Sequence, residues 1–152
     1  MFRVPTYVAP SRIAGVGVFS SEFIPSGTLL WVFTEGVDLR LDPAVVAATP
    51  EPLGSMIRMD CIEEADGTLV LCGDNARFMN HDFDPNCDDS GILTVARRDI
   101  APNEELTCDY RAFDREAAGS GLEEWRVTSV SPPSTVRCSG SSGRGCPDRT
   151  CP

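Results

Sequence analysis

The feature that most limits the fold of this chain is the shortness of its β-rich runs. These runs are rich in β-branched, aromatic and other apolar residues, are only a few residues long, and are bounded by Gly, Pro and Asp. They span residues 16–20, 28–33, 68–72, 92–96 and 106–108. Because runs this short and irregular do not build a parallel sheet, the sequence predicts a mostly β domain of several small sheets with a few short helices.

Two short helices are predicted from local signals. Asp42 followed by Pro43 is typical of an N-cap and a first helical residue, and Pro50 ends the helix that they begin. A second helix is predicted to start near Asp114 and to run toward Trp125.

Composition changes near Arg126 and divides the chain in two. Of the 152 residues, 41% are hydrophobic, which is enough to fill one domain core, and we predict a single domain over residues 1–126. Residues 127–152 are rich in Ser, Gly, Pro and Cys and have little to bury, so we predict a disordered tail. The domain holds 10 basic residues against 22 acidic ones and carries −12, whereas the tail holds three against one and carries +2.

The acidic balance limits the class of partner. A formal net charge of −10 argues against nucleic-acid binding, which needs clustered basic residues, and favours a basic protein or peptide. No apolar run approaches a membrane span, and the first residues lack a signal peptide's hydrophobic stretch, so we expect a cytoplasmic protein without membrane contact. The seven cysteines are an odd number, which argues for free thiols or a metal rather than a disulfide framework.

Two glycines mark the start of the first β-rich run. Gly15 and Gly17 flank Val16, and glycine at such positions allows a positive φ or a close approach of the backbone to a ligand. The pattern lacks the third glycine and the following helix of a dinucleotide-binding fingerprint. By itself it is typical of a plain turn.

Two later segments concentrate polar side chains. Residues 75–87 contain His81, the one histidine of the chain, within a dense set of polar residues. Such side chains cap backbone groups where two chain segments cross. Residues 96–110 read as a strand, a Pro-Asn turn and a second strand that ends on Tyr110. Each segment alone indicates no more than a β-rich domain.

Taken together and in this order, the three segments resemble the SET domain, the fold of a large family of S-adenosylmethionine-dependent protein lysine methyltransferases. The resemblance covers about residues 4–113. Gly-Val-Gly-Val-Phe at 15–19 is similar to the family's first motif, and Arg-Phe-Met-Asn-His-Asp-Phe-Asp-Pro-Asn at 77–86 is similar to its Asn-His signature. Residues 98–110 resemble its last motif, with Asn103 in place of Gly. The chain looks most like the small bacterial and viral members without a pre-SET module, which implies a β-clip fold with a C-terminal pseudoknot.

The resemblance implies a site for S-adenosyl-L-methionine next to a lysine channel. The family's cofactor-binding positions fall on Gly15, Val16, Gly17, Asn80, His81 and Tyr110. Tyr110 is implied as the catalytic residue, and with an ordinary pKa near 10 its hydroxyl is better suited to orient the amine than to act as a standing base. Cys108 and Phe113 are candidates to line the substrate channel, and core packing is the alternative for Phe113 and for Trp125.

The chain departs from the family pattern in ways that affect metal binding and the channel. Asp82 replaces the usual Ser, and Phe83 stands where many members have a Cys that joins a zinc site. We predict no metal, because the family's C-x-C-x4-C spacing is not kept, although Cys87 as a substitute ligand leaves zinc open. The cysteines that break this spacing are Cys138, Cys146 and Cys151. Cys108 is smaller than the usual Phe or Tyr, so the number of methyl groups added stays open.

Three functions compete at this point. The first is an S-adenosylmethionine-dependent protein lysine N-methyltransferase that acts on a basic protein such as a histone or histone-like protein. The second is a catalytically silent SET-like module that binds a peptide or the cofactor, which Cys108 and Asp82 would favour. The third is a β-clip relative that binds a small molecule or a metal with His81 as a ligand, for which a single histidine is weak support.

Overall fold

Short strands joined by turns make up most of the computed structural model, which describes residues 1–119. The described strands form three small sheets, with the orders β1-β2-β10-β7, β3-β9-β8 and β4-β6-β5. Their bounds are β1 Thr6–Pro10, β2 Val16–Ser20, β3 Leu29–Val32, β4 Leu39–Leu41, β5 Cys61–Glu63, β6 Leu69–Leu71, β7 Asn80–His81, β8 Cys87–Asp89, β9 Leu93–Ala96 and β10 Glu105–Cys108. The expectation of a mostly β domain of small sheets is confirmed.

The four-stranded sheet brings the three motif segments together. β10 pairs antiparallel with β2, where Glu105 lies opposite Phe19. On its other side β10 pairs in parallel with β7, where Thr107 lies opposite Asn80 and Cys108 lies opposite His81. The end of the chain's last motif is therefore held between its first motif and its Asn-His pair. The C-terminal pseudoknot, in which the chain threads through a loop at this place, stays a prediction from the family resemblance.

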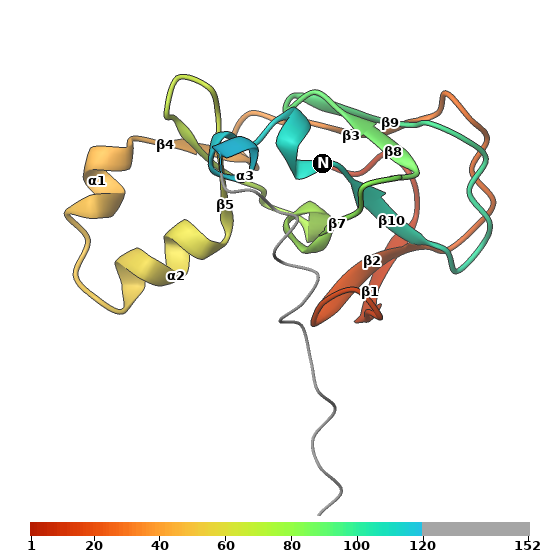
Figure 1. The fold of residues 1–152 in the computed structure, drawn as a ribbon, viewed down its shortest axis with the longest axis horizontal. Helices are drawn as coiled ribbons and strands as arrows, with labels where there is room; N and C mark the ends of the chain where they lie inside the picture. The colour runs from red at the N-terminus through yellow and green to blue at the C-terminus, as the bar shows by residue number, and fades with distance from the viewer. Residues whose placement is uncertain (120–152) are drawn as a thin grey trace, which may run out of the picture.

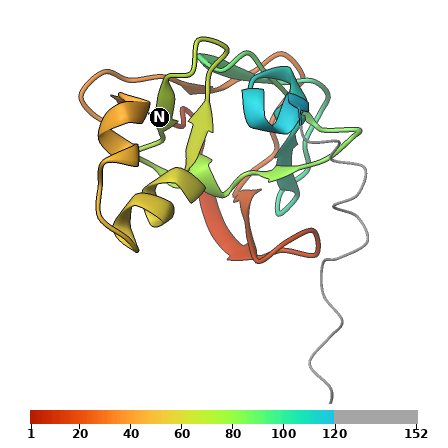
Figure 2. The same ribbon diagram turned by 60° about the vertical axis from the view of Figure 1, so that its left-hand side comes forward.

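A second part of the molecule lies beside the other two sheets. It contains the sheet of β4, β5 and β6 and two helices, α1 Pro43–Ala47 and α2 Leu53–Met59. Figure 1 shows α1, α2, β4 and β5 on the left and the β1–β2 hairpin with β10 on the right. After a turn of 60° both helices still lie at one side of the molecule (Figure 2).

The helices agree in part with the sequence. α1 has the predicted bounds, because the Asp42 carboxylate accepts a hydrogen bond from the Ala44 amide at 2.8 Å and caps its first turn. The structure also contains α2, which the sequence did not predict; its N-cap is Pro52, which makes no side-chain cap, so the usual signal is missing. The third helix, α3 Arg115–Gly119, starts where expected, and its continuation toward Trp125 lies outside the described residues.

The core is built from the inner faces of the sheets and the turns between them. Its buried cluster contains Val18, Ile24, Leu30, Met79, Cys87, Ala96, Ile100, Leu106 and Cys108. Leu106 and Cys108 are almost fully buried because their side chains pack into this cluster. Two short 3-10 helices, η1 Asn75–Phe78 and η2 Tyr110–Ala112, lead into β7 and out of β10. No helix of residues 1–119 is both long and apolar enough to cross a membrane.

Candidate active site

Asn80 joins all three motif segments through its side chain. Its Nδ2 donates hydrogen bonds to the carbonyl oxygens of Val16 at 3.0 Å and Ala14 at 3.3 Å. The same nitrogen donates to Oε1 of Glu105 at 2.7 Å. The backbone around the predicted glycine motif is therefore tied directly to β7 and β10.

Glu105 is a part of this site that the sequence did not single out. Both of its carboxylate oxygens accept a hydrogen bond from Ser11 Oγ, at 2.8 and 2.9 Å, and that oxygen in turn accepts the Ile13 amide at 2.8 Å. A Cβ at Gly17 would lie 2.1 Å from Glu105 Oε1 and 3.2 Å from Asn80 Nδ2. Gly17 leaves room for the Glu105 carboxylate, and a side chain at 17 would displace this flexible group from its hydrogen bond with Asn80. The glycine at 17, which allows a close approach to the backbone, is the one feature of the sequence that pointed to this part of the site.

Asn86 holds the crossing of the 80–86 segment with β10. Its Nδ2 donates to the Glu105 carbonyl at 2.7 Å and to Glu104 Oε1 at 3.0 Å, while its Oδ1 accepts the Thr107 amide at 2.9 Å. The side chain is 2% exposed. The predicted role of these polar residues, capping backbone groups where two segments meet, is confirmed for Asn86.

His81 presents one ring nitrogen to the protein and keeps the other free. Its Nδ1 accepts the Tyr110 amide at 3.2 Å, and its ring meets Phe83 edge-on with centroids 4.5 Å apart. Accepting at Nδ1 places the proton of the neutral ring on Nε2. Nε2 is the one buried side-chain nitrogen or oxygen of residues 1–119 that lacks a hydrogen-bond partner. A buried N–H without a partner is a donor available to a ligand.

Asp109 lies beside His81, and its negative charge is balanced by Arg111 on the other side. Its Oδ1 is 3.7 Å from His81 Nδ1. Arg111 donates to both carboxylate oxygens, at 2.8 and 2.7 Å, and this bidentate hydrogen bonding is the main reason that the pKa of Asp109 is below its ordinary value. Asp109 therefore stays ionised and is already paired.

Tyr110 is fixed through both its main chain and its side chain. Its amide donates to His81 and its hydroxyl donates to the Met79 carbonyl. Burial is the largest cause that raises the pKa of this phenol well above its ordinary value, with nearby acidic groups adding to it. The hydroxyl therefore stays protonated, which agrees with an orienting role and disagrees with a standing base.

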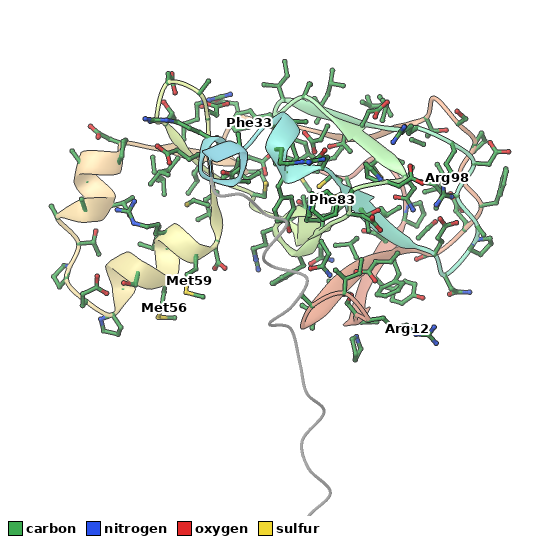
Figure 3. The ribbon with its side chains drawn as sticks, in the orientation of Figure 1. Arg12, Phe33, Met56, Met59, Phe83 and Arg98 are labelled. Carbon is green, nitrogen blue, oxygen red and sulfur yellow. The ribbon has the colours of Figure 1, made fainter. Side chains whose placement is uncertain are left out.

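A cavity of about 450 Å³ opens beside Tyr110. One wall comes from the end of α2 and from β5, with Met59 and Ile62, and the other includes His81, Cys108 and Tyr110. In Figure 3 Met59 lies on α2 and Phe83 lies across the molecule, near β7 and β10. Phe113 also lines the cavity and packs against the core, and its place in a substrate channel stays a prediction. The lining does not include Gly15, Val16, Gly17 or Asn80, and Asn80 lies in the chain between the lining residues Met79 and His81.

The thiols of the cavity are neutral. Burial raises the pKa of Cys72 to about 12 and raises that of Cys108 well above its ordinary value. Cys87, suggested by the sequence as a substitute zinc ligand, is buried in the core with a pKa of about 12. No group of three or more His, Cys, Asp or Glu among the side chains that the structure describes could hold a metal ion. Cys138, Cys146 and Cys151 lie outside the described residues.

Comparison with known proteins agrees with this geometry. The family profile described as SET domain matches residues 15–111. A Chaetomium globosum protein named "Histone-lysine N-methyltransferase, H3 lysine-4 specific" is 34% identical over 127 residues, which cover 75% of this chain and 11% of the relative. Human histone-lysine N-methyltransferase 2B is 32% identical over 124 residues, which cover 74% of this chain and 4% of the relative.

A solved structure shows the same fold. A chain of the Polycomb Repressive Complex 2 of Chaetomium thermophilum has a TM-score of 0.56 at 21% identity, and the match covers 76% of this chain and 16% of that one. Because the profile matches more than half of the residues, this chain belongs to the SET-domain family. It spans 11% or less of the length of the two curated relatives named above.

Proposed function

We propose that this protein is an S-adenosylmethionine-dependent protein lysine N-methyltransferase that acts on a basic protein such as a histone or histone-like protein. The observation that carries the proposal is the Tyr110 hydroxyl, held on the Met79 carbonyl at the wall of a cavity of about 450 Å³. Family membership and the names of the relatives support it. They favour it over the silent module, although Cys108 does depart from the family pattern.

The residues of the site fit the cofactor. The unpartnered Nε2 of His81 is a donor for a polar group of a ligand, and Asn80 fixes the exposed backbone at Gly15 and Val16. When bound, the cofactor would supply a methyl group on a sulfonium sulfur. A neutral amine can attack this methyl carbon and displace the sulfur, which leaves as a neutral thioether. Gly17 and Glu105 would shape the loop that holds it.

The chain's own residues then prepare the amine. A lysine has an ordinary pKa near 10.4, so keeping it neutral near pH 7.4 costs about 4 kcal/mol, which partial burial in the cavity can offset. Tyr110 would orient the amine through its hydroxyl oxygen, which has a lone pair left after donating to Met79. Met79, Cys108 and Phe113 would exclude water from this position.

Methyl transfer is tested with labelled S-adenosylmethionine and a panel of basic proteins that includes core histones. We expect label on lysines of at least one of them. The enzyme contains no lysine, so no side-chain lysine of its own can take the label. Cofactor binding without transfer to any protein would favour the silent module, and no cofactor binding would favour the small-molecule binder. A cytoplasmic location without membrane or nucleic-acid contact stays a prediction.

Tyr110→Phe removes the orienting hydroxyl and keeps the ring. We expect kcat to fall about 100-fold, because a misplaced amine loses the alignment on which displacement depends, while the cofactor Kd changes less than about threefold. The matched control is Tyr7→Phe, since Tyr7 is the other tyrosine and its hydroxyl bonds Asn103 away from the cavity. Equal turnover in the two variants would remove Tyr110 from this role.

A further inference from the structure

Asp89 places an ionisable carboxyl group on the wall of the same cavity as Tyr110 and Cys108. It is the last residue of β8 and lies opposite Thr94 of β9. Its Oδ2 accepts the Thr94 hydroxyl at 2.6 Å and its Oδ1 accepts the Gly91 amide at 2.7 Å. Thr94 is 1% exposed, so the carboxylate is fixed from behind by a buried strand.

The carboxylate of Asp89 has no cation of its own. None of the ion pairs formed within residues 1–119 includes it. Two arginines also line the cavity, but Arg77 instead donates to the Cys72 carbonyl at 3.4 Å and stacks on Phe78, and Arg58 is exposed. The neighbouring thiols, Cys72 and Cys108, are neutral. A partly buried carboxylate without a counter-charge is unfavourable until a ligand brings a cation.

Each oxygen of Asp89 accepts one hydrogen bond from the protein, and each can accept another. Burial is the largest cause that raises the pKa of this carboxyl group above its ordinary value. A cation in the cavity would favour the ionised form and would be bound more tightly in return. An alkylammonium group suits this position, because its N–H groups donate to a carboxylate and its alkyl chain contacts apolar walls.

We propose that Asp89 is a specificity-determining residue that binds the substrate's side-chain ammonium as it enters the cavity, before the amine is deprotonated for methyl transfer, and selects for amines that still carry N–H groups. This inference rests on the proposed function and names the residue that recognises the amine of the substrate's lysine side chain. An unmethylated ammonium has three N–H donors, a dimethylated one has one, and a trimethylated one has none. The carboxylate therefore favours unmethylated lysine and disfavours the fully methylated product.

Ammonium recognition is tested on the full chain without any methyl transfer. The ¹⁵N-labelled protein is titrated with n-butylammonium, n-butanol and n-butyltrimethylammonium, and the Gly91 amide, which bonds Asp89, reports binding. We expect n-butylammonium to bind at least about fivefold more tightly than either of the other two, because only it offers charged N–H donors. If the wild-type protein binds n-butylammonium and n-butanol with equal affinity, the proposal is overturned, and no variant is needed for this result.

Two variants locate the effect. Asp89→Asn keeps the shape and the acceptor for Gly91 but removes the charge, and the preference for n-butylammonium should fall below about twofold. Asp60→Asn is the matched control, because Asp60 is an exposed carboxylate of the same cavity lining and should leave the preference intact. A preference that persists in Asp89→Asn, or that falls equally in both variants, would contradict local binding by Asp89.

A second measurement separates this inference from the proposed function. With histone H3 tail peptides that carry unmethylated or dimethylated lysine, Asp89→Asn should lower the ratio of kcat/KM values, unmethylated over dimethylated, by about tenfold. If the wild-type protein methylates no peptide or protein, the proposed function fails, and the n-butylammonium titration still decides the role of Asp89. If it methylates the peptides and that ratio is unchanged in the variant, the inference fails and the proposed function stands.

Discussion

Tyr110 and His81 restrain each other within a few ångströms of the cavity. The histidine accepts the tyrosine's main-chain amide, and the tyrosine hydroxyl reaches back to the Met79 carbonyl, two residues before the histidine. Their rings lie 5.4 Å apart between centroids. This arrangement leaves the phenol few positions, and a fixed hydroxyl is what an orienting role needs. The same contacts leave His81 Nε2 as the remaining donor.

The protonation of Tyr110 can be measured in a protein with one tyrosine. The chain has two tyrosines, so Tyr7→Phe leaves Tyr110 as the only one. Because burial raises the pKa of Tyr110, its phenolate should be absent as the pH rises through the ordinary value of 10.0 and should form only above it. The measurement is the ultraviolet absorbance of phenolate against pH, with circular dichroism recording whether the fold is intact. Phenolate at or below pH 10 in folded protein would contradict a buried phenol.

At the scale of elements, β10 depends on polar side chains from its neighbours as much as on strand pairing. It is short, yet it is bonded to β2 on one edge and to β7 on the other. Asn86 supplies further bonds to its main chain from the segment after β7. These bonds hold the strand that carries Glu105 and leads to Tyr110. The positions of both residues therefore depend on the crossing of the 80–86 segment with β10.

Asn86→Ala should destabilise the fold strongly. The change leaves the Glu105 carbonyl and the Thr107 amide without their partner in a buried place, and we expect the free energy of unfolding to fall by about 2–4 kcal/mol. Urea denaturation followed by circular dichroism measures this. Ser90→Ala is the control, because Ser90 is exposed and donates a single weak bond at 3.2 Å. Similar midpoints for both variants would show that the crossing does not depend on Asn86.

The turn before β10 explains one departure from the family. Asn103 stands where the family has Gly, and its φ is 63°, in the left-handed region that glycine adopts freely and asparagine tolerates. Its Oδ1 also accepts the Tyr7 hydroxyl at 2.9 Å. The substitution therefore keeps the family's backbone and adds a contact with β1.

Asn103→Ala should destabilise the protein by about 1 kcal/mol and Asn103→Gly by less, because both variants lose the hydrogen bond with Tyr7 but only alanine opposes a positive φ. Thermal unfolding of the two variants beside the wild-type protein tests this order. A glycine variant that is less stable than the alanine variant would mean that backbone conformation is not what selects Asn103.

At the scale of the whole molecule, the charge of −10 concerns association rather than fold. Three carboxylates, of Asp60, Asp89 and Asp114, line the cavity together with two arginines, Arg58 and Arg77, so the lining is negative on balance and would attract a basic partner. Such attraction weakens as the Debye length shortens with added salt.

Methylation of core histones should therefore be sensitive to salt. Raising NaCl from about 0.05 to 0.5 M should lower kcat/KM mainly through a higher KM, because the encounter is screened while the buried chemistry is not. A lysine peptide without net charge is the matched control and should respond far less. Equal salt dependence for both substrates would show that the acidic surface does not draw the partner in.

Much of the fold follows from residues that are close in sequence. The bounds of β2 and α1 were predicted correctly, and β3, β6, β9 and β10 were predicted to within a few residues, because strand runs and an Asp-Pro cap are local signals. The strands β1, β4, β5, β7 and β8 and the helix α2 were missed. Their residues include prolines, polar or charged side chains and exposed apolar side chains, and pairing with another strand or packing stabilises them.

The sequence by itself determined the order of the motifs and the family that they resemble, and it predicted Tyr110, Asn80 and His81 as site residues. The tertiary structure alone decided which side chains meet there. Ser11 and Glu105 are 94 residues apart, and Asn80 and Glu105 are 25 apart, yet they share one set of hydrogen bonds. Asp89 reaches the wall beside Tyr110 because β8 lies on β9 in another sheet. Local propensity extends over a few residues, whereas contacts between distant segments form only when burial of the common core compensates for the loss of chain entropy.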